Sequence, residues 1–208
     1  MSSQIKQRYY TPEEYLELES VAEYRSEYLE GEIFAMANGS PDHSIISINL
    51  TGELRTALRG KRCQPFDKGL KVGPASSVFF FYPDASIVCG NLILHKKSKD
   101  VCTNPKVIFE VLSPSTEAYD RGSKFARYRT IESFTDYVLI AQDEPRIEHF
   151  SKQKDGSWNL RIVSELKNKI RIPSIGCMLS LAEIYERVKF PEKKSLIKAT
   201  RKKKPRKA

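Results

Sequence analysis

The sequence has no long apolar run and no apolar leader. Its longest apolar stretch runs from Val78 to Tyr82 and continues past Pro83 and Asp84 to Val88, about half of the roughly 20 residues that a membrane-spanning helix needs. The first residues, MSSQIKQRYYTPEEY, lack the apolar segment of a secretory signal. We therefore expect a cytoplasmic protein with no membrane partner.

Several motif classes are also missing. The four cysteines form no CxxC pair and the three histidines have no i, i+4 spacing, so a structural zinc site is not expected. We expect the cysteines to be small buried apolar side chains or partly exposed thiols. The sequence contains no Walker A motif, no G-x-G-x-x-G and no G-x-S-x-G. These absences argue against P-loop nucleotide hydrolysis, dinucleotide redox chemistry and a serine hydrolase.

Excess positive charge is confined to the C-terminus. The chain has 35 Lys and Arg against 26 Asp and Glu, but residues 189–208 hold ten bases and one acid, which leaves 25 bases and 25 acids in residues 1–188. The bases of this tail include Lys202, Lys203, Lys204 and Arg206. A segment so basic and so poor in apolar residues is expected to be disordered and to bind nucleic-acid phosphates. The alternative is a terminus that only improves solubility.

Residues 1–189 have the pattern of one α/β domain, and residues 190–208 form the tail. Caps and turn residues separate segments of helical and of strand periodicity. The expected helices are Pro12 to about Glu19, a long helix ending at Gly60, one that begins after Ser115 and Thr116, and one from the capping box Ser180–Glu183 to Val188. The expected strands are 26–29, 32–36, 65–72, 78–88, 106–112 and 136–141, with a further hairpin around Asp155. This order predicts a sheet with helices packed on it, a helix and hairpin before it, and a hairpin and helix after it.

Two of the expected strands are apolar on both faces, as interior strands are, and each is interrupted by one carboxylate. Asp84 follows Pro83 in one strand, and Glu110 lies within Val107–Leu112 in the other. A buried carboxylate is costly unless it is paired or bound to a metal, and two on neighbouring strands repel each other. A divalent cation such as Mg²⁺ between Asp84 and Glu110 resolves both problems. The alternative is that each acid lies at a strand end, exposed or paired with a base.

The helix that follows Glu110 supplies a third candidate group. Arg121, Lys124 and Tyr128 are spaced i, i+3, i+7 and therefore lie along one helix face. A lysine near the metal can orient or deprotonate the attacking water, or stabilise charge on a phosphoryl oxygen. The alternative is a surface pair, because Asp120 and Lys124 are spaced i, i+4.

At these residues the sequence resembles the nuclease core of the PD-(D/E)XK superfamily, and over residues 9 to 188 it is similar to the Uma family of restriction-endonuclease-like proteins. The matching positions are 10–15, 27–32, Met36, Pro41, His43, Pro83, Asp84, the block Glu110–Thr116, Asp120, Lys124 and Tyr128. The resemblance implies a restriction-endonuclease-like fold with a central mixed sheet flanked by helices. It also implies an endonuclease that hydrolyses DNA with Mg²⁺ or Mn²⁺, and a homodimer whose two sites cut two strands.

The resemblance also assigns roles to residues. Two positions after Glu110, where the superfamily motif has lysine, this sequence has Leu112. In the Uma family the lysine comes from the following helix, which here implies Lys124. The family's glutamate and histidine near the start correspond to Glu32 and His43, which become accessory candidates together with Tyr128 and Arg121. A lone histidine at a helix start is more often a cap or a satisfied polar contact, which is the alternative for His43.

Two other functions stay open at this point. One is a nucleic-acid-binding module of the same fold whose catalytic centre has decayed, since a fold does not establish turnover. The other is a scaffold independent of DNA, whose tail only touches acidic partners. Plasmid cleavage separates the nuclease from the first, and metal binding that is lost in Asp84→Ala separates it from the second.

Removing residues 190–208 tests the tail. If its bases neutralise DNA phosphates, the plot of log affinity against log salt should become flatter by about 0.9 for each lost contact. Binding should weaken at every sequence, because a flexible lysine-rich arm contacts phosphates and reads no bases. Binding isotherms from low to physiological salt measure this, and an unchanged slope would show that the tail does not engage DNA.

Overall fold

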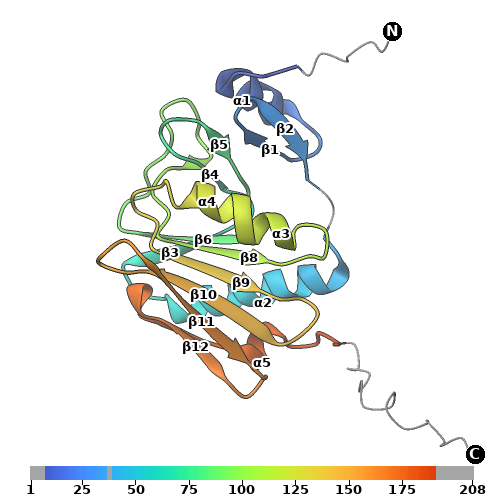
Figure 1. The fold of residues 1–208 in the computed structure, drawn as a ribbon, viewed down its shortest axis with the longest axis vertical. Coiled ribbons are helices and arrows are strands. Elements are labelled where there is room, and N and C mark those ends of the chain that lie inside the picture. Colours follow the sequence, from blue (N-terminus) through green and yellow to red (C-terminus); the bar gives the residue numbers. More distant parts are fainter. Residues whose placement is uncertain (1–7, 37–38, 191–208) are drawn as a thin grey trace, which may run out of the picture.

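The structure is a computed structural model and describes residues 8–36 and 39–190 (Figure 1). Its first helix, α1 (Pro12–Val21), is capped by Thr11, whose hydroxyl accepts a hydrogen bond from the Glu14 N–H while the Glu14 carboxylate accepts one from the Thr11 N–H. This is a capping box with proline in the first turn, and the predicted start at Pro12 is confirmed.

A short hairpin follows, with β1 (Ser26–Leu29) antiparallel to β2 (Glu32–Ala35). Its two turn residues, Glu30 and Gly31, have φ of 49° and 100°, as a two-residue hairpin turn with two left-handed positions requires. On its other side β1 pairs with β5 (Phe79–Phe80), which makes a three-stranded sheet in the order β2-β1-β5.

The central sheet has six strands in the order β11-β10-β9-β8-β6-β3. Their bounds are β3 (Cys63–Asp67), β6 (Ala85–Cys89), β8 (Val107–Val111), β9 (Asp136–Ile140), β10 (Arg146–Lys152) and β11 (Trp158–Ser164). Strands β8 and β9 are parallel and the other neighbours antiparallel, so the sheet is mixed. Beside it, β4 (Lys71–Val72) and β7 (Val101–Cys102) form a small parallel pair.

Two apolar layers cover the two faces of this sheet. Ile87 and Phe109 pack with the long helix α2 (Pro41–Ala57), with α5 (Leu181–Ile184), and with the hairpin of β12 (Lys169–Ile172) and β13 (Cys177–Ser180). Val88 follows Ile87 on β6, and Ile108 precedes Phe109 on β8, so both side chains point to the other face. There they pack with residues of α4 (Phe125–Tyr128), which lies on the opposite side of the sheet from α2 (Figure 1). The central strands are therefore apolar on both faces, as predicted.

Several elements differ from the expected ranges. The strand expected over 65–72 is divided between β3, in the central sheet, and β4, which pairs with β7. The strand expected over 78–88 is split between β5 and β6, because Pro83 has no N–H to donate to a ladder. The helix expected after Ser115 is divided into α3 (Glu117–Tyr119), a π-helical turn η1 (Asp120–Lys124) and α4. The last helix, α5, ends at Ile184 and the Ser180 side chain makes no capping hydrogen bond.

Other features were not foreseen. Sequence periodicity missed the β12–β13 hairpin, which is joined by a single 3-10 turn, η2 (Pro173–Ile175). Cys63 and Cys89, which face each other on β3 and β6, form a disulfide, although free thiols were expected. Cys102 and Cys177 are free and buried, as expected.

The end of the domain and the tail lie at the limit of the described residues. Phe190 packs against Tyr185, one residue beyond the expected domain boundary, so a truncation that tests the tail should keep Phe190. Lys202, Lys203, Lys204 and Arg206 lie outside the described residues. In residues 8–36 and 39–190, no helix combines the length and the apolar character that crossing a membrane requires.

The packing of α2 gives a prediction on stability. Leu50 is fully buried against the sheet, whereas Ile48 on the same helix is 71% exposed. Leu50→Ala should lower the free energy of unfolding by about 2–5 kcal/mol through lost burial and a cavity. Ile48→Ala should change it by no more than about 0.5 kcal/mol. Urea unfolding of both variants measures the difference, and equal effects would contradict this placement of α2.

Candidate active site

Asp84 and Glu110 meet at one end of the central sheet. Strand β6 pairs with β8 so that Ala85 lies opposite Phe109, and continuing this antiparallel register places Asp84 opposite Glu110. Glu110 is 4% exposed. The alternative of an exposed acid is therefore excluded for Glu110, whereas that of an acid paired with a base agrees with its contact to Lys124. The two strands bring both carboxylates to one place.

The Asp84 carboxylate is held by two groups. Its Oδ2 accepts a hydrogen bond of 2.7 Å from the backbone N–H of Val111 and lies 3.3 Å from Nε2 of His43. His43 occupies the first turn of α2, and its N–H donates to the Ser40 hydroxyl that caps the helix. The hydrogen bond to Asp84 raises the pKa of His43 despite the opposing effect of burial. Ser40 is the cap, and His43 orients Asp84.

The Glu110 carboxylate points toward the helix side of the sheet. Its Oε1 accepts a hydrogen bond of 2.9 Å from the Tyr128 hydroxyl and lies 3.0 Å from Nζ of Lys124. Burial raises the pKa of Glu110 above its usual range, and the nearby carboxylates of Asp120 and Asp84 add to the rise while Lys124 opposes it. Tyr128 therefore belongs to the site as the group that orients Glu110.

Lys124 is surrounded by carboxylates. Its Nζ lies 3.0 Å from Glu110, 3.1 Å from Glu27 and 3.8 Å from Asp120, and the side chain is 6% exposed. Burial alone would lower the pKa of Lys124, but the three acids outweigh it and raise the pKa above the usual range. The i, i+4 pair of Asp120 and Lys124 exists, but it is buried within the site and is not a surface pair.

The π-helical turn decides which side chains face the site. Within η1, Asp120 and Lys124 are buried. Arg121 turns away: its Nε donates to Glu117 at 2.7 Å, and its guanidinium binds both carboxylate oxygens of Glu148 on β10. Arg121 therefore lies outside the site, although regular helical spacing placed it on the face of Lys124 and Tyr128.

The accessory glutamate of the site is Glu27 and not Glu32, which the sequence predicted. Glu27 lies on β1, and its Oε1 accepts a hydrogen bond of 2.9 Å from the Tyr82 N–H. That N–H is available because the chain leaves β5 before Pro83 and enters β6 after it. Glu32 faces Leu29 at the start of β2 and does not line the cavity described below. The hairpin itself was predicted, but no pattern in it distinguished one glutamate from the other.

The four carboxylates and the two bases of the site line a cavity of about 670 Å³: Glu27, Asp84, Glu110, Asp120, Lys124 and His43. The carboxylates and Lys124 form its inner wall, and Phe34, Met36, Ser113 and Gln142 are among the residues around them. Phe34 and Met36 are 46% and 36% exposed, so apolar side chains from β2 and the residue after it lie beside the acidic centre.

The charges of the cavity do not balance. Its lining contains four acids, Glu27, Asp84, Glu110 and Asp120, against Lys124, His43 and the exposed Lys68. With all four carboxylates ionised, negative charge remains in excess whether or not His43 is protonated, and most of it is buried. Burial and this crowding of acids together raise the pKa of Glu110 and of Asp120. Oxygen ligands and uncompensated negative charge are what Mg²⁺ or Mn²⁺ requires. Among the described residues no three His, Cys, Asp or Glu side chains are already arranged as a metal site, but Mg²⁺ needs only one or two carboxylates plus water and phosphate.

The comparisons with known proteins identify the family and the fold of this chain. The Uma2 family, described as "Putative restriction endonuclease", matches residues 12–182. The chain belongs to the Uma2 family. Uncharacterized protein slr1290 of Synechocystis sp. is 35% identical over 180 residues, which cover 86% of this chain and 93% of that protein. Uncharacterized protein sll1609 of the same organism is 35% identical over 150 residues, covering 72% of this chain and 85% of its own length.

The fold is shared with a solved structure. A putative nuclease belonging to DUF820 from Anabaena variabilis superposes with a TM-score of 0.68 at 19% identity, over 85% of this chain and 97% of that one. The Uma2 chain therefore has the mixed α/β, restriction-endonuclease-like fold that the sequence resemblance implied. Family and fold together support a nuclease.

Glu27 and Glu32 form a matched pair for testing the site. Glu27→Gln should weaken Mn²⁺ binding by about 10- to 100-fold, the usual loss when a group supporting a metal site is changed. Glu32→Gln removes the same charge from the same hairpin outside the cavity and should leave Mn²⁺ affinity unchanged. Isothermal titration calorimetry with Mn²⁺ measures both, and the reverse ranking would restore Glu32 to the site.

Proposed function

We propose that this Uma2 protein is a Mg²⁺- or Mn²⁺-dependent endonuclease that hydrolyses phosphodiester bonds of DNA. The observation that carries the proposal is the excess of buried carboxylates around Lys124 at the end of the sheet. In a purely structural ion-pair cluster, each uncompensated buried carboxylate would destabilise the fold by several kcal/mol, roughly. In a metal site, the bound divalent cation compensates this excess negative charge.

Asp84 and Glu110 would hold the ion, and both offer carboxylate oxygens at the sheet end. The bound ion supplies screening of the scissile phosphate and a lower pKa for an attacking water. His43 and the Val111 N–H fix the Asp84 carboxylate, and Tyr128 fixes that of Glu110. These contacts hold the carboxylates in place before substrate arrives.

Lys124 would position the water and stabilise negative charge on the phosphoryl oxygens. Its Nζ lies within 3.1 Å of Glu110 and Glu27, while Asp120, at 3.8 Å, contributes charge without a hydrogen bond. The surrounding acids overcome the effect of burial and raise the pKa of Lys124, so the ammonium stays protonated, which favours positioning and charge stabilisation over the alternative role of general base. Glu27 and Asp120 then act as positioning residues that hold the ammonium next to Glu110.

Removing either proposed metal ligand should abolish metal-dependent cleavage and leave the fold intact. Asp84→Asn and Glu110→Gln are nearly isosteric, and without metal they should leave thermal stability equal or raise it, because they relieve repulsion between carboxylates. Asp42→Asn, in the first turn of α2 next to His43, is the control and should cleave normally. Plasmid cleavage with Mg²⁺ and Mn²⁺ measures this; full activity in both variants would refute the ligand assignment.

Lys124→Met should lower the single-turnover cleavage rate by about 10²- to 10⁴-fold, the range for a positioned acid, base or charge. The affinity for Mn²⁺ should stay unchanged or rise, because the variant removes the ammonium that partly offsets the carboxylates. For the same reason the melting temperature of the variant should fall below that of the wild type in EDTA and recover when Mn²⁺ is added. Loss of metal binding with an unchanged rate at saturating metal would show that the role is wrong.

The cleavage assay also separates this proposal from a decayed module. DNA binding without cleavage under any divalent metal would favour the nucleic-acid-binding alternative. The homodimer implied by the family resemblance stays a prediction, which sedimentation of the full chain tests.

A further inference from the structure

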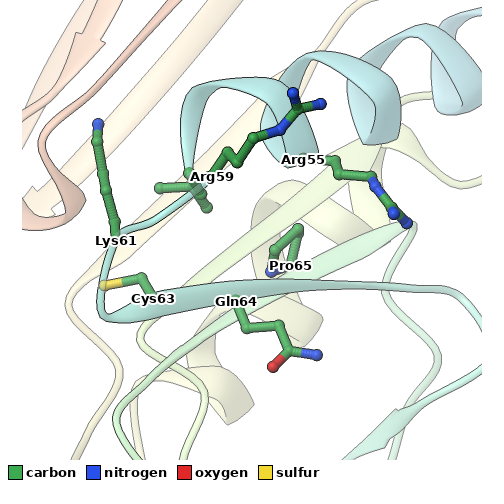
Figure 2. Close-up of a pocket in the computed structure, with 7 residues that line it drawn as sticks. Arg55, Arg59, Lys61, Cys63, Gln64 and Pro65 are labelled. Atoms are coloured by element: carbon green, nitrogen blue, oxygen red, sulfur yellow. The ribbon is translucent and has the colours of Figure 1, made fainter.

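A second charged site lies at the far end of α2 from the cavity. Arg55, Arg59 and Lys61 line a pocket of about 370 Å³ together with Cys63, Gln64 and Pro65 of strand β3. Figure 2 shows the three basic side chains extending from the end of the helix and from the turn that follows it, above β3. No acidic residue lines this pocket.

The sequence concentrates charge here. Residues 55–66 contain four bases, Arg55, Arg59, Lys61 and Arg62, and no acid, within a region of residues 1–188 that is neutral as a whole. Among the described residues, Arg55, Arg59 and Arg62 form no ion pair within 4.0 Å, whereas Arg121, Arg127 and Arg146 each bind a glutamate. The cluster therefore keeps its positive charge available at the surface.

A structural role does not explain the cluster. A base in the last turn of α2 complements the helix dipole, which accounts for Arg55. Arg59 lies in the turn after the helix, and it brings a second positive charge to the same pocket with no acid in the lining to offset it. Lys61 is fixed by a hydrogen bond of 2.6 Å from Nζ to the Gly176 carbonyl. In the described residues, no ion pair of Arg55 or Arg59 stabilises the fold, so the clustering of these charges does not contribute to stability.

The pocket is built on a rigid base. Gly60 has φ of 72°, a left-handed conformation that turns the chain from α2 into β3 and brings Lys61 beside the helix end. The Cys63–Cys89 disulfide ties the start of β3 to β6. A guanidinium group binds phosphate oxygens with two parallel hydrogen bonds, which suits Arg55 and Arg59, unpaired among the described residues, to a phosphate ligand.

We infer that the pocket of Arg55, Arg59 and Lys61 binds phosphates of a DNA duplex at a distance from the cleavage site. Arg55 comes twelve residues after His43 along the helix, a rise of about 18 Å. That span corresponds to about five nucleotide steps of a strand at about 3.4 Å each. One duplex could thus place a phosphodiester at the acidic cavity and further phosphates at this pocket. The inference rests on the proposed function only in choosing DNA as the partner.

The test is the salt dependence of duplex binding in EDTA, where no cleavage occurs. Arg55→Gln/Arg59→Gln should weaken binding uniformly across sequences and flatten the slope of log affinity against log salt by about 0.9 per lost contact, about 1.8 for two. The control is Lys154→Gln/Arg161→Gln, which removes the same charge on the β10–β11 hairpin at the opposite edge of the sheet. It should leave the slope unchanged.

The outcomes separate this inference from the proposed function. A wild-type slope in Arg55→Gln/Arg59→Gln, an equal loss in the control, or no duplex binding by the wild-type chain each overturns the phosphate pocket. Absence of metal-dependent cleavage with the expected loss of slope would overturn the proposed nuclease and leave the pocket standing. Because both arginines are exposed, circular dichroism of the double variant should match that of the wild type.

Discussion

The burial of one ammonium group among several carboxylates is the interaction on which the rest of the molecule depends. Lys124 partly offsets Glu27, Glu110 and Asp120, which come from a hairpin, an interior strand and a π-helical turn, and the hairpin is far in sequence from the other two. None of these charges could be buried alone, because each requires the others in place. The cluster therefore fixes the N-terminal hairpin and η1 against the central sheet, and it still leaves negative charge uncompensated.

The fold supplies this arrangement by interrupting regular structure at defined points. Pro83 lies between β5 and β6 and places Asp84 directly before the first residue of β6, and the same interruption frees the Tyr82 N–H to hold Glu27. The π turn Asp120–Lys124 directs both of its terminal side chains inward. π turns are often found at functional sites, and here the turn decides which base of the segment reaches the carboxylates. Local irregularity and the charged centre thus coincide.

The sequence predicted the parts of this site that depend on composition and alternation, and missed those that depend on tertiary contact. Asp84 and Glu110 interrupt apolar strands, so their burial and proximity could be foreseen. Lys124 and Tyr128 followed from helical spacing and family resemblance. Arg121 was misplaced because regular spacing does not hold across a π turn. Glu27 was missed because its selection over Glu32 depends on pairing between β1 and a strand some fifty residues later. The Cys63–Cys89 pair was missed for the same reason: only the β3–β6 register makes the two residues neighbours.

The location of a bound Mn²⁺ ion tests the central claim most directly. Crystals grown with Mn²⁺ and measured at its absorption edge should show an anomalous peak between the carboxylates of Asp84 and Glu110, and Asp84→Asn should remove it. The same crystals should keep Lys124 within the cavity beside Glu27 and Asp120. A peak elsewhere, or none at Mn²⁺ concentrations that saturate calorimetric binding, would contradict the assignment of this carboxylate cluster as a metal centre.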